Sequence, residues 1–223
     1  MRRLLLVFLF ALAAAPVSLF SQQAFFKSVA GAVEIKHAGS EVWEAARAGQ
    51  ALFSNTVIST GFKSAAVIEF GDSLITARPL TRLTLSELIK IDNNEKVDLN
   101  IQTGRVRSDV SAPPGGKVEF TIRSSSATTS VRGTSFEVNT LGVVVTKGVV
   151  RFAGFTGAPV LVDAGGYSRV DERTGRVVNP KAAALEELSP NLPVASETVR
   201  ELSQPSEQPE LFPIALGFNV YNN

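Results

Sequence analysis

The sequence contains no cysteine and a single histidine, His37. Without cysteine, disulfides, a thiolate nucleophile, a lipid-modified N-terminal Cys and Cys-based metal sites are all excluded. A Ser-His-Asp triad could use only His37, and a metal site with several histidine ligands is excluded as well. His37 comes at the end of a predicted strand, where we expect a residue at the rim of the fold. We therefore predict no catalytic residues, no metal site and no cofactor.

Other motifs that could support enzymatic chemistry are equally scarce. Asp72 and Asp163 fall at predicted turns, where Asp is common, and nothing pairs them at the spacing of a general acid and base. The residues from Pro114 to Lys117 lack the spacing of a phosphate-binding loop. The hydroxyl-rich run from Ser124 to Ser130 is predicted to face solvent on a strand, rather than to contact a glycan or phosphate. We predict that the protein is not an enzyme, and acidic glycosidase chemistry is the least favoured alternative.

A strong charge of either sign is also missing, since 22 basic and 21 acidic residues give a formal net charge of +1. Without residues 1–21, which include Arg2 and Arg3, 20 basic side chains stand against 21 acidic ones. A nearly neutral chain with no basic block gives no electrostatic reason to expect nucleic acid or an anionic membrane surface as a partner. Apolar residues make up 44% and charged residues 19%, which is typical of a globular protein.

One long apolar run is present, from Leu4 to Phe20, directly behind Met1-Arg2-Arg3. A short basic region, an apolar region and then small polar residues form the layout of a secretory signal. We predict a signal peptide at 1–21, cleaved near Ser21, and a periplasmic or secreted protein of a bacterial envelope with no stable membrane span after cleavage. The alternative is an uncleaved anchor, but Pro16 interrupts the run, whose 17 residues are at the short limit for a spanning helix.

From Val33 onward, apolar and polar side chains alternate in short segments, with turn residues every ~8–12 residues. The clearest alternation is at 97–102, and the strongest break is Pro-Pro-Gly-Gly at 113–116. No amphipathic helix precedes Lys181. We predict an all-β fold, either a short-strand solenoid-like domain or a sandwich, and a barrel is also compatible with this spacing. One set of apolar residues shares a parity, and so one expected face: Leu83, Leu85, Ile89 and Ile91.

The β-domain is predicted over residues 25–178, because the composition changes after Asn179-Pro180. Residues 179–223 are rich in Pro, Ser, Gln and Glu and predict a largely irregular tail. A short helix is an option at 182–188. Residues 211–223 are apolar enough to dock on the domain or on a partner.

The segment 129–138, Thr-Ser-Val-Arg-Gly-Thr-Ser-Phe-Glu-Val, closely resembles the FecR domain family. The most recognisable feature of that family is an apolar-Arg-Gly-Thr-x-Phe-x-Val pattern. Weaker matches occur in family order on both sides, so that the resemblance covers about residues 30–170; they lie at 31–33, 48–52, 58–61, 66–70, 103–106 and 144–150. The resemblance implies an extracytoplasmic, β-rich module.

Well-known members of this family relay the siderophore-loaded state of an outer-membrane transporter to an extracytoplasmic-function sigma factor. Those regulators carry a cytoplasmic anti-sigma segment ahead of a membrane helix, whereas only Met1 to Arg3 precede the apolar run here. The resemblance therefore favours a non-enzymatic binding module of the cell envelope, whose partner is another envelope protein or a glycan. The alternative is a FecR-type signalling component, linked to siderophore or iron sensing through a separate membrane partner.

Within the Arg-Gly-Thr motif the apolar parity changes, since Val131 is odd and Phe136 is even. A β-bulge or tight corner at Gly133-Thr134 would explain this change, because Gly supplies the backbone freedom that such a corner needs. We predict a structural motif made of Val131, Arg132, Gly133, Thr134 and Phe136.

Arg132 lies beside this predicted corner. Its planar guanidinium could bind the carboxylate of Glu69, Glu137 or Asp72 and so hold two layers of the fold together. An Arg132 that instead binds a ligand is the alternative interpretation.

Overall fold

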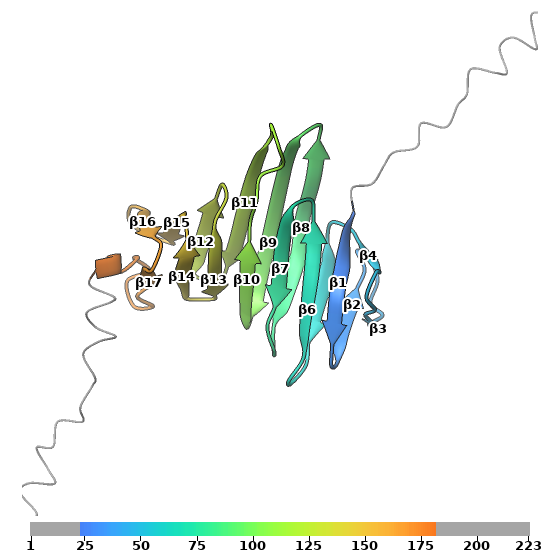
Figure 1. The fold of residues 1–223 in the computed structure, drawn as a ribbon. Coiled ribbons are helices and arrows are strands. Elements are labelled where there is room, and N and C mark those ends of the chain that lie inside the picture. Colours follow the sequence, from blue (N-terminus) through green and yellow to red (C-terminus); the bar gives the residue numbers. More distant parts are fainter. Residues whose placement is uncertain (1–22, 182–223) are drawn as a thin grey trace, which may run out of the picture. The chain divides into compact units, whose positions relative to one another are not determined.

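The computed structural model describes residues 23–181, so the predicted signal peptide at 1–21, the helix option at 182–188 and nearly all of the tail lie outside it. Within the described residues the chain forms seventeen strands (Figure 1), and no helix there is long and apolar enough to cross a membrane. The strands are β1 (Ala24–Ala30), β2 (Val33–Lys36), β3 (Glu44–Ala45), β4 (Ala51–Leu52), β5 (Thr56–Thr60), β6 (Ala65–Phe70), β7 (Ser73–Ala77), β8 (Arg82–Ile91), β9 (Asn94–Thr103), β10 (Arg105–Asp109), β11 (Lys117–Ser124), β12 (Ala127–Val131), β13 (Ser135–Asn139), β14 (Gly142–Lys147), β15 (Val149–Gly154), β16 (Val160–Asp163) and β17 (Tyr167–Arg169).

The strands form two sheets, which the chain builds together by crossing repeatedly from one to the other. Sheet A has the order β17-β14-β13-β10-β7-β6-β1-β4, and sheet B the order β16-β15-β12-β11-β9-β8-β5-β2-β3. Pairing between named strands is antiparallel except for β9 and β11, because β10 crosses to sheet A between them. The predicted all-β fold is confirmed. Both sheets are open, and within each the strands lie side by side nearly in their order along the chain, as in a solenoid.

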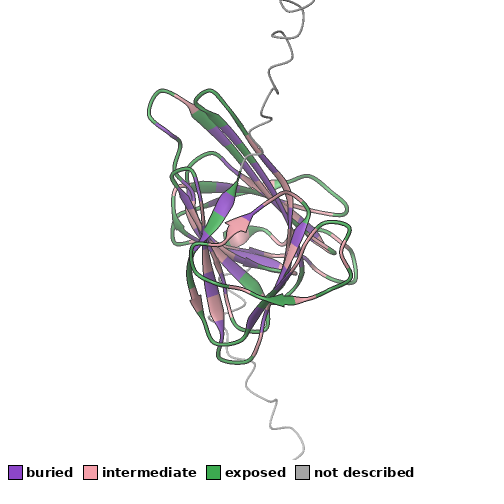
Figure 2. Cartoon of the chain, turned by 90° about the vertical axis from the view of Figure 1, so that its right-hand side faces the viewer, coloured by how far each residue is buried: buried purple, intermediate pink, exposed green. Residues whose placement is uncertain are grey.

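The inward side chains of both sheets make one hydrophobic core. Burial alternates along the strands as their period of two requires, for example buried at every second residue of β5 and β6. Figure 2 shows these buried stretches on the strands and exposed residues in the loops. The largest fully buried side chains include Phe26, Phe120, Phe136 and Phe152.

A β-bulge in β8 overturns the expectation that Leu83, Leu85, Ile89 and Ile91 share one face. The register with β9 shifts between Leu85 and Glu87, which inserts one residue into β8. Leu83 and Leu85 are buried, but beyond the bulge Leu88 takes the inward position. Ile89 and Ile91 therefore point outward, and Ile91 is 63% exposed. The prediction of a single face was wrong for the second half of this strand.

The turns and loops gather at the two ends of the strands. We call these two sides of the fold the upper edge and the lower edge, as they appear in Figure 1. The upper edge holds the turns at 71–72 and 92–93, the loop at 110–116 and the Arg-Gly-Thr segment at 132–134. The lower edge holds the turns at 31–32, 61–64 and 78–81 and the β9–β10 connection at Gly104. Features that are far apart in the sequence are thus gathered at one edge or the other.

Candidate functional site: a groove beside the Arg-Gly-Thr corner

The Arg-Gly-Thr segment carries the chain from sheet B to sheet A. Val131 is the last residue of β12 and points into the core from sheet B, while Phe136 on β13 points into it from sheet A. The change of parity seen in the sequence accompanies this crossing. Gly133 has a φ of 128°, a conformation that side-chain-bearing residues rarely adopt.

Thr134 fixes the corner to two other parts of the upper edge. It is buried, its N–H donates to the carbonyl of Val110 (3.1 Å), and its own carbonyl accepts from the N–H of Val110 (2.9 Å). Its Oγ1 donates to the carbonyl of Val149 at 3.2 Å. A Cβ on Gly148 would lie only 3.1 Å from that Oγ1. The Thr of the motif therefore joins the corner to β15 and to the loop that follows β10.

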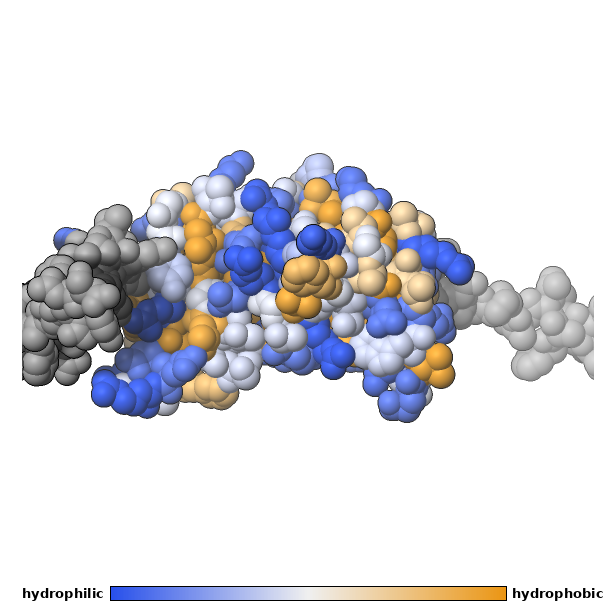
Figure 3. All heavy atoms as spheres, turned by 90° about the horizontal axis from the view of Figure 1, so that it is seen from below, coloured by the Kyte–Doolittle hydropathy of each residue, from blue (hydrophilic) through white to orange (hydrophobic). Residues whose placement is uncertain are grey.

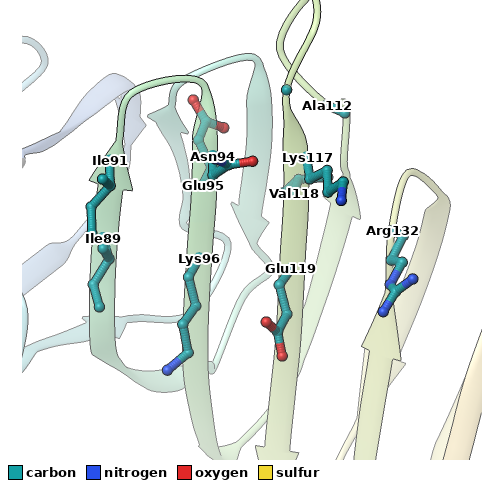
Figure 4. Close-up of a pocket in the computed structure, with 11 residues that line it drawn as sticks. Ile89, Ile91, Asn94, Glu95, Lys96, Ala112, Lys117, Val118, Glu119 and Arg132 are labelled. Carbon is teal, nitrogen blue, oxygen red and sulfur yellow. The ribbon is translucent and has the colours of Figure 1, made fainter.

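Arg132 does not form the ion pair that the sequence suggested. Among residues 23–181, Glu69 pairs with Lys27 (3.0 Å) and Glu137 pairs with Arg78 (3.0 Å), and Arg132 is in no ion pair. The Arg132 side chain is exposed and lies at the margin of a groove (Figure 4).

This groove lies on the outward face of sheet B, near the upper ends of β8, β9 and β11, and has a volume of about 640 Å³. Ile89 and Ile91, turned outward by the bulge, supply its apolar side. Its exposed charged lining comes from β9, β11 and the end of β12, and comprises Lys96, Lys117, Glu119 and Arg132.

The charges in the groove follow the strand register. Ile89, Lys96 and Glu119 are directly paired across β8, β9 and β11, and Arg132 stands beyond Glu119 at the end of β12 (Figure 4). Lys96 also pairs with Glu87, whose hydrogen bond and charge raise the pKa of the Lys96 ammonium. An apolar side thus faces a row in which one carboxylate stands between two cations.

A buried carboxylate supports the groove from the core side. The Glu95 side chain is 0% exposed; its Oε1 pairs with Lys90 Nζ at 2.9 Å, and its Oε2 has no hydrogen-bond partner within the described residues. A Cβ on Gly71 would overlap this carboxylate. Gly71 belongs to sheet A's turn at 71–72, so the tip of the β8–β9 hairpin rests on the opposite sheet through Glu95.

The structure does not bring the other candidate residues into one site. Asp72 lies in the β6–β7 turn of sheet A, whereas Asp163 ends β16 at the far margin of sheet B. His37 directly follows β2. The run Ser124–Ser130 spans the end of β11, the turn and most of β12, and within it Ala127 and Thr129 are buried, so the expectation that the run faces solvent was wrong for these two residues. No cluster of His, Asp and Glu that could hold a metal occurs between residues 23 and 181.

Sequence reasoning missed the apolar half of the groove. Ile89 and Ile91 continue the parity of buried residues, so the pattern assigns them to the core. Only the additional apolar residue Leu88, out of step with Leu85, hints at the bulge in the sequence.

The fold and the corner define a β-rich module with a surface groove and no assembled catalytic cluster in the part described. Residues 56–151, from β5 into β15, match the family described as FecR protein. The resemblance found in the sequence is thereby confirmed.

Two crystal structures of a candidate anti-sigma factor from Parabacteroides distasonis are similar to this chain, each with 18% identity and a TM-score of 0.45. The alignments cover 59% and 58% of this chain, and 63% and 62% of the solved chains, so this chain spans less than two thirds of their length. No curated protein matches the sequence.

Proposed function

We propose that the chain is a non-enzymatic binding module of the bacterial cell envelope, and that it binds another envelope protein through the groove on sheet B. The observation that carries this proposal is the outward placement of Ile89 and Ile91 on one side of the groove, with the exposed Arg132 on the other side. The FecR family match supports a non-enzymatic role. The predicted signal peptide at 1–21 supports a periplasmic or secreted location.

The lining favours a protein segment over a glycan. Binding sites combine apolar contact with a few polar groups that fix orientation. Two isoleucines on one side of the groove, with Lys117 and Arg132 on the other, suit an extended peptide with apolar and acidic side chains. None of the groove's lining residues is an aromatic on which a sugar ring could stack. A glycan ligand is the competing outcome of the test.

The test is a crosslinking pull-down from native envelope with paired variants. We expect Ile91→Ser with Arg132→Gln to lose the recovered protein, while Leu161→Ser with Arg151→Gln, also exposed on sheet B, keeps it. Both double variants should keep the wild-type melting temperature, because exposed side chains contribute little to stability. Recovery of no partner, of a glycan, or of the same protein with both variants would contradict the proposal.

A second candidate function follows from the family match itself. The FecR domain favours a signalling component that acts with a separate membrane partner and responds to siderophore or iron status. Deletion of the gene should then change sigma-factor-dependent transcription when siderophore is supplied. If the transcript profile is unchanged and a partner is still recovered at the groove, the signalling role is contradicted and the binding role is retained.

A further inference from the structure

The lower edge of the fold carries large apolar side chains at the tips of its turns. Phe62 in the turn at 61–64 is 73% exposed, and Leu80 in the turn at 78–81 is 57% exposed. The two turns touch, since the N–H of Leu80 donates to the carbonyl of Gly61 at 3.2 Å. Two segments that are separate in the sequence thus place an exposed Phe and an exposed Leu on adjoining turns.

The backbone at these tips is unusual for the residues that occupy it. Four non-glycine residues in the described chain have positive φ, and two of them, Asn55 and Asp92, are types that tolerate it. The other two are Leu80 (58°) and Lys63 (53°), in these same turns. Leu80 follows Pro79 at a position of the turn where Gly or Asn is usual. Folding alone gives no reason for an exposed leucine there, and such outliers often mark functional sites.

Side-chain hydrogen bonds of two threonines hold the turns together at their base. Thr60 and Thr81 are both buried; Thr60 Oγ1 donates to the carbonyl of Arg78 (2.6 Å) and accepts from the N–H of Thr81 (2.9 Å). Thr81 Oγ1 donates to the carbonyl of Arg105 at 2.9 Å, which ties in the β9–β10 connection. The backbone groups of Gly61, Arg78 and Thr81, at the base of the two turns, are thus hydrogen-bonded within the protein, so these bonds persist when the tips enter a less polar medium.

Positive charge surrounds the apolar tips. Lys63, Arg78 and Arg105 lie in or beside the turns, Arg82 follows at the start of β8, and none of the residues at 31–32, 61–64, 78–81 and 104–105 is acidic. The nearby carboxylate of Glu137 pairs with both Arg78 and Arg105 and leaves an excess of cations. Figure 3, which views this edge from below, shows apolar atoms among hydrophilic ones.

We propose that the lower edge binds the surface of a lipid bilayer that contains anionic headgroups, with Phe62 and Leu80 inserted at the interface. Apolar tips flanked by lysine and arginine combine burial of apolar area with attraction to anionic lipid, the two terms that hold peripheral proteins on membranes. Projecting side chains on separate turns suit a soft, planar partner. The nearly neutral net charge of the whole chain gives no sign of this patch, because its basic residues come from separate segments that only the fold brings together.

The absence of cysteine allows a direct test in the full chain, with one environment-sensitive fluorophore on Phe62→Cys and a control on Ile91→Cys at the upper edge. Addition of phosphatidylglycerol vesicles should shift the emission at position 62 to the blue and raise it severalfold. Phosphatidylcholine vesicles, or high salt, should largely abolish that change. The label at position 91 should not respond.

A second measurement removes the tips. Phe62→Ser with Leu80→Gly should lower partition onto phosphatidylglycerol vesicles by about tenfold or more. Leu80→Gly should not harm folding, because Gly accepts the positive φ. No response at position 62, equal responses at both labels, or a response to solubilised envelope proteins but not to vesicles would overturn the proposal. The groove lies at the opposite edge, so peptide binding there would be unaffected by such a failure.

Discussion

Phe120 of sheet B meets Phe136 of sheet A edge to face, with ring centroids 6.3 Å apart and an interplanar angle of 84°. Both rings are fully buried. Phe136 is the Phe of the Arg-Gly-Thr-x-Phe pattern, so the corner that moves the chain between sheets also delivers the ring that joins them. Such aromatic pairs add to the stabilisation that comes from burial itself.

Phe136→Ala should therefore lower the free energy of unfolding by about 3–5 kcal/mol, from lost burial and the cavity left behind. Phe155→Ala is the matched control, since Phe155 is 76% exposed and its loss should change stability by no more than about 0.5 kcal/mol. Urea unfolding of both variants makes the comparison. Equal losses would mean that the ring pair does not hold the sheets together.

Thr134→Val tests the polar half of the corner. The substitution keeps the side-chain shape but removes the hydroxyl that donates to the carbonyl of Val149, so we expect a loss of about 1–2 kcal/mol. Thr128→Val offers a control, because Thr128 lies on the preceding strand β12, faces outward and is only partly buried. Thermal or urea unfolding should separate the two. If both variants were equally stable, the corner would not depend on this hydrogen bond.

The fold class could be predicted from the sequence because its signal is repeated. Alternation with a period of two recurs in segment after segment, and most breaks carry Gly, Pro, Asn or Asp. What the alternation does not specify is which sheet a strand joins. The crossing at Arg132–Thr134 was visible as a change of parity, yet a bulge within one strand would give the same pattern.

The site was largely hidden for a related reason. The bulge between Leu85 and Glu87 contains no glycine, so Leu88 is the single local sign that Ile89 and Ile91 leave the core. The partner of a charged side chain is equally inaccessible to pattern reasoning, because Glu137 finds Arg78, which is 59 residues away in the sequence. Long-range register decides both outcomes.

Gly71→Ala tests whether the buried Glu95 carboxylate fixes the β8–β9 hairpin to sheet A. Gly71 and Gly39 both have positive φ (55° and 74°), but a Cβ on Gly39 would meet nothing within 4 Å. Gly39→Ala should thus lose only about 1–2 kcal/mol from backbone strain. Gly71→Ala should lose about 1–3 kcal/mol more, because its Cβ overlaps a carboxylate that cannot move freely.

The coupling between the two residues can be measured in a double-mutant cycle. In a Glu95→Ala background the overlap is gone, and Gly71→Ala should then cost about as much as Gly39→Ala. Urea unfolding of the four proteins provides the numbers. Additive losses for Gly71→Ala and Glu95→Ala would show that the hairpin tip does not rest on this contact.

Asp98 should make stability depend on pH. Burial on β9 raises the pKa of its carboxyl above the ordinary 3.8, although Arg123, with a guanidinium nitrogen 3.1 Å from Oδ2, lowers it in part. A raised folded-state pKa means that the folded protein binds this proton more tightly than the unfolded chain does. Asp98 therefore destabilises the fold least below the ordinary pKa. Its destabilising effect grows as pH rises through the window up to the folded-state pKa, and is constant above it.

Asp98→Asn removes this titration. The unfolding free energy of the variant minus that of the wild type should increase as pH rises from about 3 through that window and then level off. Arg123→Gln, which removes the cation that lowers the pKa of Asp98, should extend the decline of stability to higher pH. Urea unfolding at a series of pH values checks both. A difference that stays constant, or that decreases as pH rises, would mean that Arg123 offsets the burial of Asp98 completely.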